Sequence, residues 1–178
     1  MISLILVTII SLVLAALSVF CIVVILYISI IGDFKGAPFV RSKPQRIKIM
    51  VNLAVIHPGT RVIDLGSGDG SILIEAASHG AFATGIEMNP FLVRYSRWRI
   101  KRKGLEKKIT LIKGDLRVYP LGDADIIFCY LLKSTLSKLK EKFAQELKPG
   151  VKIISNAFTI PGWIPLKEKN GVFVYEKQ

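Results

Sequence analysis

A loop built from alternating glycines carries the residues in this sequence that are best suited to chemistry. In the segment VIDLGSGDG, Gly66, Gly68 and Gly70 remove the Cβ atoms that would keep a bound cofactor away from the backbone. Asp64 precedes the glycines and Asp69 lies among them. These carboxylates would repel the pyrophosphate of a dinucleotide, whose fingerprint G-x-G-x-x-G also places its third glycine one position later. The loop therefore favours a cofactor that presents cationic groups.

Two further acids end predicted strands and complete the set. Glu87 ends FATGIE about 20 positions after Gly68, close to the spacing at which an acid binds ribose hydroxyls. Asp115 follows the next strand in the segment KGD, where a carboxylate can accept a hydrogen bond from the amino group of adenine. An adenosine that carries an ammonium and a sulfonium is S-adenosyl-L-methionine (SAM). We therefore predict that SAM is bound by Asp64, Gly66, Ser67, Gly68, Gly70, Glu87, Met88, Asp115 and Leu116.

The elements that must hold these residues alternate between strand and helix patterns. The apolar runs of strand length are RVIDL, FATGIE, KITLIKGD, DADIIFCYLL and VKIISNAF. Helical spacing of apolar residues recurs in the ranges 43–56, 70–80, 89–104 and 134–150. Near the end of the chain, Asn170-Gly171 predicts a hairpin. This order predicts an α/β fold with a doubly wound, mostly parallel, Rossmann-like sheet and an antiparallel C-terminal hairpin.

The N-terminal run contains no charged side chain before Asp33. A helix of about 20 apolar residues crosses the hydrocarbon core of a bilayer, so this run is long enough to span it. A cleavable signal peptide would have a basic N-terminal region and a shorter apolar core, and this run has neither. We predict one transmembrane helix near residues 4–29. The predicted domains are an anchor (1–32), a linker with a pre-domain helix (33–58) and a cofactor-binding domain (59–178).

The charges that flank this apolar run are one-sided. The basic residues that closely follow it are Lys35, Arg41, Lys43, Arg46 and Lys48. Under the positive-inside rule, this asymmetry predicts a single-pass membrane protein with its N-terminus outside and its C-terminal domain in the cytoplasm.

The net charge of +12 indicates an anionic neighbour. Because the chain also carries an apolar span, we expect the basic helix 94–103 to face an anionic lipid surface, and we do not expect a nucleic acid partner. The basic face of this helix is formed by Arg94, Arg97 and Lys101. A second face is expected to pack on the sheet, and its members are Leu92, Tyr95 and Trp98. We expect the protein to be a monomer.

The two cysteines, Cys21 and Cys129, both lie in apolar runs. The sequence has no Cys-x-x-Cys motif and no Cys/His cluster. We therefore predict neither a disulfide nor a metal site.

Several stretches of the chain resemble the class I SAM-dependent methyltransferases over residues 36–178. The motif DLGSGDG is generic to that class, whereas GIEMNPFLVRYSRWR and the later FTIPGW are more particular. Together with PFV before the first helix of the domain and GDL after its third strand, they are most similar to one family. Its members are the membrane-anchored protein-lysine methyltransferases that modify the adenine nucleotide translocase and the ATP synthase c-subunit. They also place a hydrophobic segment before the catalytic domain.

The resemblance implies a membrane-anchored SAM-dependent methyltransferase that N-methylates a lysine of a membrane-associated protein. Methylation of a lipid or quinone, or of RNA, stays open as the alternative. Enzymes that methylate nucleobase amino groups carry an Asn/Asp-Pro-Pro-aromatic turn after the fourth strand, and this chain has Tyr130-Leu131-Leu132 there. Tyr130 could hydrogen-bond the acceptor amine and is the candidate catalytic residue, without a dedicated general base. The predicted acceptor pocket consists of Phe39, Tyr130, Phe158 and Trp163.

Overall fold

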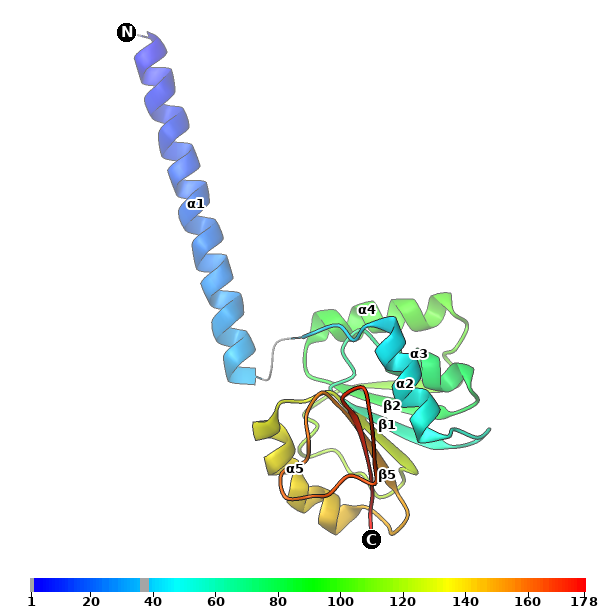
Figure 1. Cartoon of the computed structure of the whole chain (residues 1–178). Helices are drawn as coiled ribbons and strands as arrows, with labels where there is room; N and C mark the ends of the chain where they lie inside the picture. Colours follow the sequence, from blue (N-terminus) through cyan, green and yellow to red (C-terminus); the bar gives the residue numbers. More distant parts are fainter. Residues whose placement is uncertain (1, 36–38) are drawn as a thin grey trace. The chain divides into compact units, whose positions relative to one another are not determined.

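The computed structural model describes the backbone of residues 2–35 and 39–178, and the side-chain surroundings of residues 5–27 and 39–178. Its contacts divide the chain into two compact units, Met1–Pro38 and Phe39–Gln178. Helix α1 (Ile2–Lys35) makes up the first unit. The second unit is an α/β domain (Figure 1).

Helix α1 contains an apolar stretch that is long enough to cross a membrane. By length and composition, the stretch Ile5–Tyr27 could do so, with 23 residues and a mean hydropathy of 3.2. Its hydroxyl groups donate hydrogen bonds to carbonyl oxygens of the same helix: Thr8 to Ile5 at 2.8 Å and Ser18 to Leu14 at 2.7 Å. Internal pairing of this kind lowers the cost of placing hydroxyls in apolar surroundings.

The domain is built on one seven-stranded sheet in the order β3-β2-β1-β4-β5-β7-β6. Strands β1 to β5 are parallel, and β7 runs antiparallel to both of its neighbours. The predicted fold class is confirmed, and the strand order reverses between β1 and β4, where doubly wound sheets bind ligands. The strands are β1 (Arg61–Leu65), β2 (Phe82–Glu87), β3 (Ile109–Lys113), β4 (Ile126–Cys129), β5 (Lys152–Asn156), β6 (Lys167–Lys169) and β7 (Val172–Glu176).

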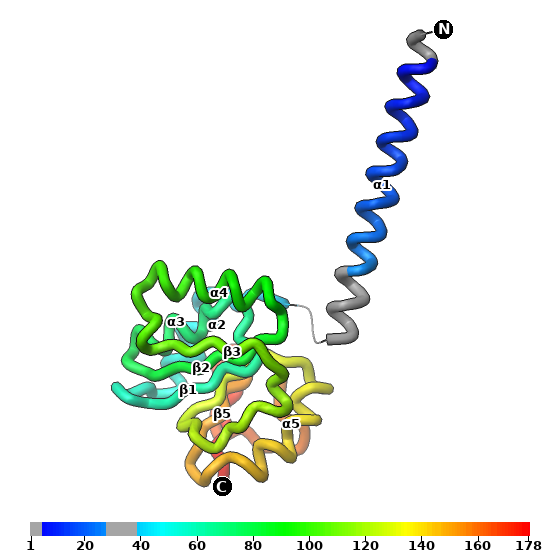
Figure 2. Tube along the Cα trace, turned by 180° about the vertical axis from the view of Figure 1, so that it is seen from behind, coloured from blue at the N-terminus to red at the C-terminus, as the bar shows by residue number. Residues whose placement is uncertain are grey.

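Helices cover the two faces of the sheet unequally. Helices α2 (Pro44–Ala54), α3 (Ser71–Ser78) and α4 (Pro90–Arg102) lie on one face, and α5 (Lys133–Glu146) lies on the other (Figures 1 and 2). A separate cluster of buried apolar residues lies under each layer. On the α5 side, the remaining cover comes from the two connections at 114–125 and 157–166, which contain no helix.

Helix α4 packs on the sheet with a different face from the predicted one. Its buried residues are Val93, Ser96 and Ile100. Tyr95 and Trp98 are 44% and 51% exposed. The expectation that Leu92, Tyr95 and Trp98 form the packed face is therefore wrong.

The close approach of the glycine loop to α4 explains this difference. A Cβ atom at Gly70 would lie 2.1 Å from the hydroxyl oxygen of Ser96, so the two backbones meet where no large side chain fits. Residue size alone would place the aromatic rings inside, whereas the contact requires serine. The start of α4 is as predicted, because the Asn89 side chain accepts hydrogen bonds from the backbone N–H groups of Phe91 and Leu92.

Candidate active site

A buried carboxylate without a partner marks the end of β1. Asp64 is only 1% exposed, and its Oδ2 atom has no hydrogen-bond partner among the described residues. Burial raises the pKa of this carboxyl to about 8, and the nearby negative charges of Glu87 and Asp69 add to the effect. An unpaired carboxylate at this depth would be stabilised by a cationic ligand group, which is what the ammonium of SAM would supply.

The carboxylate of Glu87, at the end of β2, binds the glycine loop that follows β1. Its Oε2 atom accepts a hydrogen bond from the backbone N–H of Gly68 at 2.9 Å, and Oε1 accepts one from the N–H of Asn89 at 2.8 Å. Each carboxylate oxygen can accept more than one hydrogen bond, so Glu87 still has acceptor capacity for ribose hydroxyls. Glu87 therefore both shapes the loop and remains suited to its predicted role.

The aromatic ring of Phe39 lies against the glycine loop. A Cβ atom at Gly68 would lie 2.4 Å from Cε2 of Phe39, and Gly68 has a φ of +53°, a backbone conformation that favours glycine. On the other side of the loop, Leu131 and Leu116 are the side chains nearest to Gly66. Phe39 was predicted as part of the acceptor pocket, and the structure brings it to the cofactor loop.

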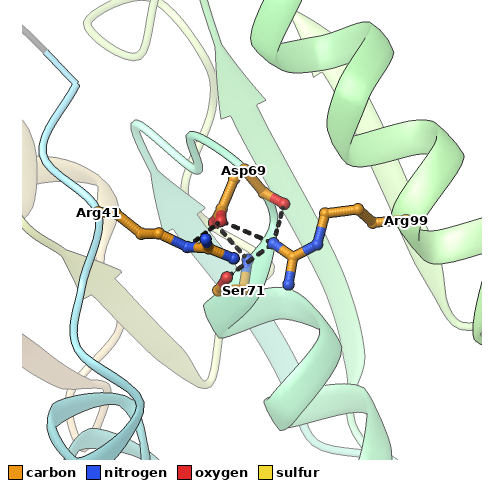
Figure 3. Close-up of polar contacts among 4 residues, drawn as sticks. All are labelled: Arg41, Asp69, Ser71 and Arg99. Atoms are coloured by element: carbon orange, nitrogen blue, oxygen red, sulfur yellow. Dashed lines mark hydrogen bonds and ion pairs between the residues drawn. The ribbon is translucent and has the colours of Figure 1, made fainter.

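Asp69 is bound by two arginines and is not free for a cofactor. Its Oδ2 atom lies 3.0 Å from Nε of Arg41 and 2.7 Å from Nη1 of Arg99, and its side chain is 7% exposed (Figure 3). Arg99 also donates to the carbonyl oxygen of Asp69 and to the hydroxyl of Ser71. The sequence placed Asp69 among the acids that suit a cationic cofactor. In the structure, its carboxylate is already paired with two arginines, and it holds the loop in place.

The third acid, Asp115, is hydrogen-bonded by Arg117, two residues further along the chain. Arg117 donates to it from the backbone N–H at 2.9 Å and from Nε at 2.9 and 3.0 Å. These hydrogen bonds hold the pKa of the Asp115 carboxyl below its usual range. Asp115 and Leu116 follow β3, and Met88 follows β2. All three are half-buried.

Three of the predicted acceptor residues follow β4 or β5. Tyr130 directly follows β4 and is half-buried. Phe158 follows β5, and its carbonyl oxygen accepts a hydrogen bond from Ser155 at 2.6 Å. Trp163 packs edge-on against Tyr175 at 6.2 Å, and Tyr175 pairs with the second residue of β5. Trp163 therefore packs on the α5 side of the sheet, against the buried cluster that contains Cys129 and Leu131, the neighbours of Tyr130 in the chain.

Three residues near the site were not identified from the sequence. Arg99 ends the stretch GIEMNPFLVRYSRWR but was given no role there, and Leu131 approaches the glycine loop from a position that no motif marks. Asn156 is 3% exposed and its Oδ1 atom has no partner among the described residues. A polar residue at the end of the apolar run VKIISN was a signal for it, because the corresponding ends of β1 and β2 also carry polar side chains.

Comparison with known proteins agrees with this geometry. The profile of the ANTKMT methyltransferase domain matches residues 64–167. A protein-lysine N-methyltransferase of Saccharolobus islandicus is 32% identical over 130 residues, which cover 72% of this chain and 81% of the relative. The human lysine N-methyltransferase of the ATP synthase c-subunit is 32% identical over 128 residues, which cover 72% of this chain and 54% of that protein. This chain therefore spans about half the length of its human relative.

A solved structure extends the similarity to the cofactor. The RNA methyltransferase from Salinibacter ruber, in complex with S-adenosyl-L-homocysteine, superposes with a TM-score of 0.73 at 33% identity, covering 78% of this chain and 92% of that one. S-adenosyl-L-homocysteine is the product that SAM leaves after methyl transfer. The bare loop, the unpaired Asp64 and Glu87 fit that cofactor. This chain belongs to the ANTKMT methyltransferase family and is a SAM-dependent methyltransferase.

Proposed function

We propose that the protein is a membrane-anchored lysine N-methyltransferase whose substrate is a membrane-associated protein. The observation that carries the proposal is the similarity over 72% of the chain to enzymes named as protein-lysine N-methyltransferases. The acids at the ends of β1 and β2 support it, because they suit SAM. Helix α1 supports it as well, because a catalytic domain tethered to a bilayer meets membrane proteins at high local concentration.

The proposed mechanism depends mainly on positioning. Bound SAM supplies a methyl group on a positively charged sulfur. Asp64 and Glu87 would fix the cofactor by its ammonium and ribose groups, so that an amine could approach the methyl carbon in line. Phe39 would complete the wall over Gly68, because its ring already contacts that residue.

The acceptor lysine must reach this site in its neutral form. A lysine side chain has a reference pKa of about 10.4, so it must lose a proton before it can attack. Apolar surroundings disfavour the ammonium form, and Phe39, Tyr130 and Phe158 would supply them. The Tyr130 hydroxyl would accept a hydrogen bond from the amine and orient its lone pair. Trp163 was predicted with this set and would add to these apolar surroundings.

The proposed topology follows from the sequence. We propose that α1 spans the membrane once, with the N-terminus outside and the catalytic domain in the cytoplasm. Protease added to intact cells should then leave the domain intact. Cleavage of the domain under these conditions would reverse the orientation, and recovery of the full-length protein in the soluble fraction after a salt wash would refute the anchor.

Labelling would identify the acceptor class. The full-length protein is incubated with methyl-labelled SAM and a membrane fraction, and the label is followed into protein, lipid and RNA. We expect label on lysine residues of membrane proteins, and none with a Glu87→Ala variant. Label confined to lipid extracts, or to RNA as the name of the Salinibacter relative would suggest, would refute the lysine proposal.

A further inference from the structure

The outer face of α4 carries an unusual row of aromatic side chains. Phe91, Tyr95 and Trp98 are spaced four and three residues apart, which places them on one face of the helix. All three are exposed, Phe91 at 82%. The face is opposite to the buried residues of α4. Elsewhere in the described domain, the exposed large aromatic side chains are Phe39 and Phe82. We call Phe91, Tyr95 and Trp98 the aromatic stripe.

The aromatic stripe contains a ring stack and is flanked by positive charge. The rings of Tyr95 and Trp98 stack at 5.8 Å, and the guanidinium of Arg102 lies 4.9 Å from the Trp98 ring. Helix α4 contains no acidic residue. Its basic residues are Arg94, Arg97, Arg99, Lys101 and Arg102. Arginine and lysine beside exposed tryptophan and phenylalanine are typical of helices that lie in the interface of an anionic bilayer.

Helix α5, on the opposite face of the sheet, provides an internal reference. It is amphipathic as well, and it buries Leu136, Leu139 and Phe143. Its exposed residues carry both signs of charge and include no aromatic side chain; they are Lys133, Ser134, Ser137, Lys138, Glu141, Ala144 and Gln145. A helix of this domain can therefore face solvent without the exposed aromatic and exclusively basic side chains of α4.

The start of the described domain is linked to α4 through Asp69. Arg41 and Arg99 of α4 bind the carboxylate of Asp69 from opposite sides (Figure 3). The segment 36–42, which links α1 to the domain, can extend to at most about 25 Å. If α1 spans a bilayer, α4 is within reach of its surface. The start of α4 also adjoins the cofactor site, because Glu87 accepts a hydrogen bond from Asn89.

We propose that the aromatic stripe and its flanking arginines dock onto an anionic bilayer surface, and that this contact orients the cofactor edge of the sheet toward the membrane. The inference rests on the proposed function, since it specifies how a tethered domain faces its substrate. Docking is measured without turnover, so it can fail while lysine methylation succeeds, and the reverse also holds.

The two tryptophans of the chain permit a direct test. The full-length Trp163→Phe variant retains Trp98 as its only tryptophan, and the Trp98→Phe variant retains Trp163. Both are reconstituted into vesicles of phosphatidylcholine, with or without phosphatidylglycerol, that contain brominated acyl chains. We expect strong bromine quenching of Trp98 only in the anionic vesicles, weakened by high salt, and little quenching of Trp163 in either. If Trp163→Phe does not fold, the Tyr95→Trp/Trp98→Phe variant is compared with Trp98→Phe, which shares Trp163, and the additional quenching reports on the same face of α4.

Charge variants complete the test. Replacing Arg94 and Lys101 with glutamate should decrease the equilibrium constant for docking by at least about fivefold per residue. The matched control replaces Lys133 and Lys138 of α5 with glutamate and should leave the quenching unchanged. Trp98 that stays unquenched in anionic vesicles, or equal quenching of Trp98 and Trp163, would refute the proposal. It would also be refuted if RNA, and not anionic lipid, altered the Trp98 emission.

Discussion

The ends of β1 and β2 differ from the ends of β4 and β5 in how their polar groups are held. At the first pair, Glu87 binds two backbone N–H groups and Asp69 binds two arginines. Only Asp64 is left buried and unpaired among these acids. At the second pair, Ser155 donates to the carbonyl oxygen of Phe158, but among the described residues neither the Tyr130 hydroxyl nor Oδ1 of Asn156 has a hydrogen-bond partner. We call the ends of β1 and β2 the cofactor half and the ends of β4 and β5 the predicted acceptor half. More of the polar groups of the cofactor half are held by the chain itself, and we expect a substrate to complete the acceptor half.

The largest effect is expected from a side chain added to the cofactor loop. Gly68→Val places a branched side chain at a φ of +53° and drives it into Phe39. Together these costs should weaken SAM binding by at least about a hundredfold. Gly104→Val is the matched control, because Gly104 has a φ of +65° and open space around it. Calorimetry that shows equal losses for both variants would contradict the contact.

The pair of arginines on Asp69 should have unequal effects on stability. Arg99→Gln removes a largely buried ion pair and the hydrogen bonds to the loop, so we expect a loss of about 2 kcal/mol in the free energy of unfolding. Arg41 is mostly exposed, and Arg41→Gln should cost less than about 1 kcal/mol. Denaturant unfolding of the two variants measures the difference. A larger loss for Arg41 would show that the segment before α2, and not α4, holds the loop.

The raised pKa of Asp64 predicts a dependence of SAM affinity on pH. The free protein holds a proton on Asp64 below a pH of about 8, and a cationic cofactor requires that proton to leave. Affinity should therefore fall by up to about tenfold per pH unit as the pH decreases below 8. Calorimetry in buffers of different ionisation enthalpy should detect the released proton, and Asp64→Asn should abolish the release.

The same shift affects the stability of the free protein in the opposite sense. In the unfolded chain, Asp64 loses its proton near pH 4, while the folded chain keeps it to about pH 8. The stabilisation that this group contributes is complete below pH 4 and is lost as the pH rises to 8. The Asp64→Asn variant should lack this part of the pH dependence in a comparison of unfolding curves.

The smallest effect is expected at the acceptor half. Tyr130→Phe removes one hydroxyl that would orient the amine, so turnover should fall about fivefold while SAM affinity stays unchanged. Initial rates with a membrane fraction and calorimetry with SAM separate the two quantities. Weakened SAM binding by this variant would place Tyr130 in the cofactor half and would remove the distinction between the two halves.

Local sequence spacing marks the predicted cofactor residues more clearly than the predicted acceptor residues, for a physical reason. Gly68, Glu87 and Asn89 act within short stretches whose spacing is set by strand-turn-helix geometry, so their pattern is visible along the chain. The pairing of Asp69 with Arg41 and Arg99 joins residues about 30 positions apart on either side, and no local pattern marks it. Likewise, the exposure of Tyr95 and Trp98 follows from the close contact between Ser96 and Gly70, which is a tertiary feature.

The connection after β5 likewise depends on tertiary contacts that the sequence pattern does not show. The strands and the turn at Asn170-Gly171 were predicted, and both turn residues have positive φ values, 52° and 71°. The path of 157–166 was not, because its course depends on Trp163 packing against Tyr175 and on the Ile160 N–H donating to the Tyr175 hydroxyl. The acceptor pocket that groups Trp163 with Tyr130 stays a prediction.

Equilibrium binding of SAM tests most directly whether acids at the strand ends recognise the cofactor. Calorimetry compares the full-length protein with Glu87→Ala and with Glu106→Ala, an exposed acid in the connection before β3. We predict that the wild-type protein binds SAM and not NADH, that Glu87→Ala loses at least about tenfold in affinity, and that Glu106→Ala is unchanged. Unaltered SAM binding by Glu87→Ala, or binding of NADH in place of SAM, would contradict the assignment.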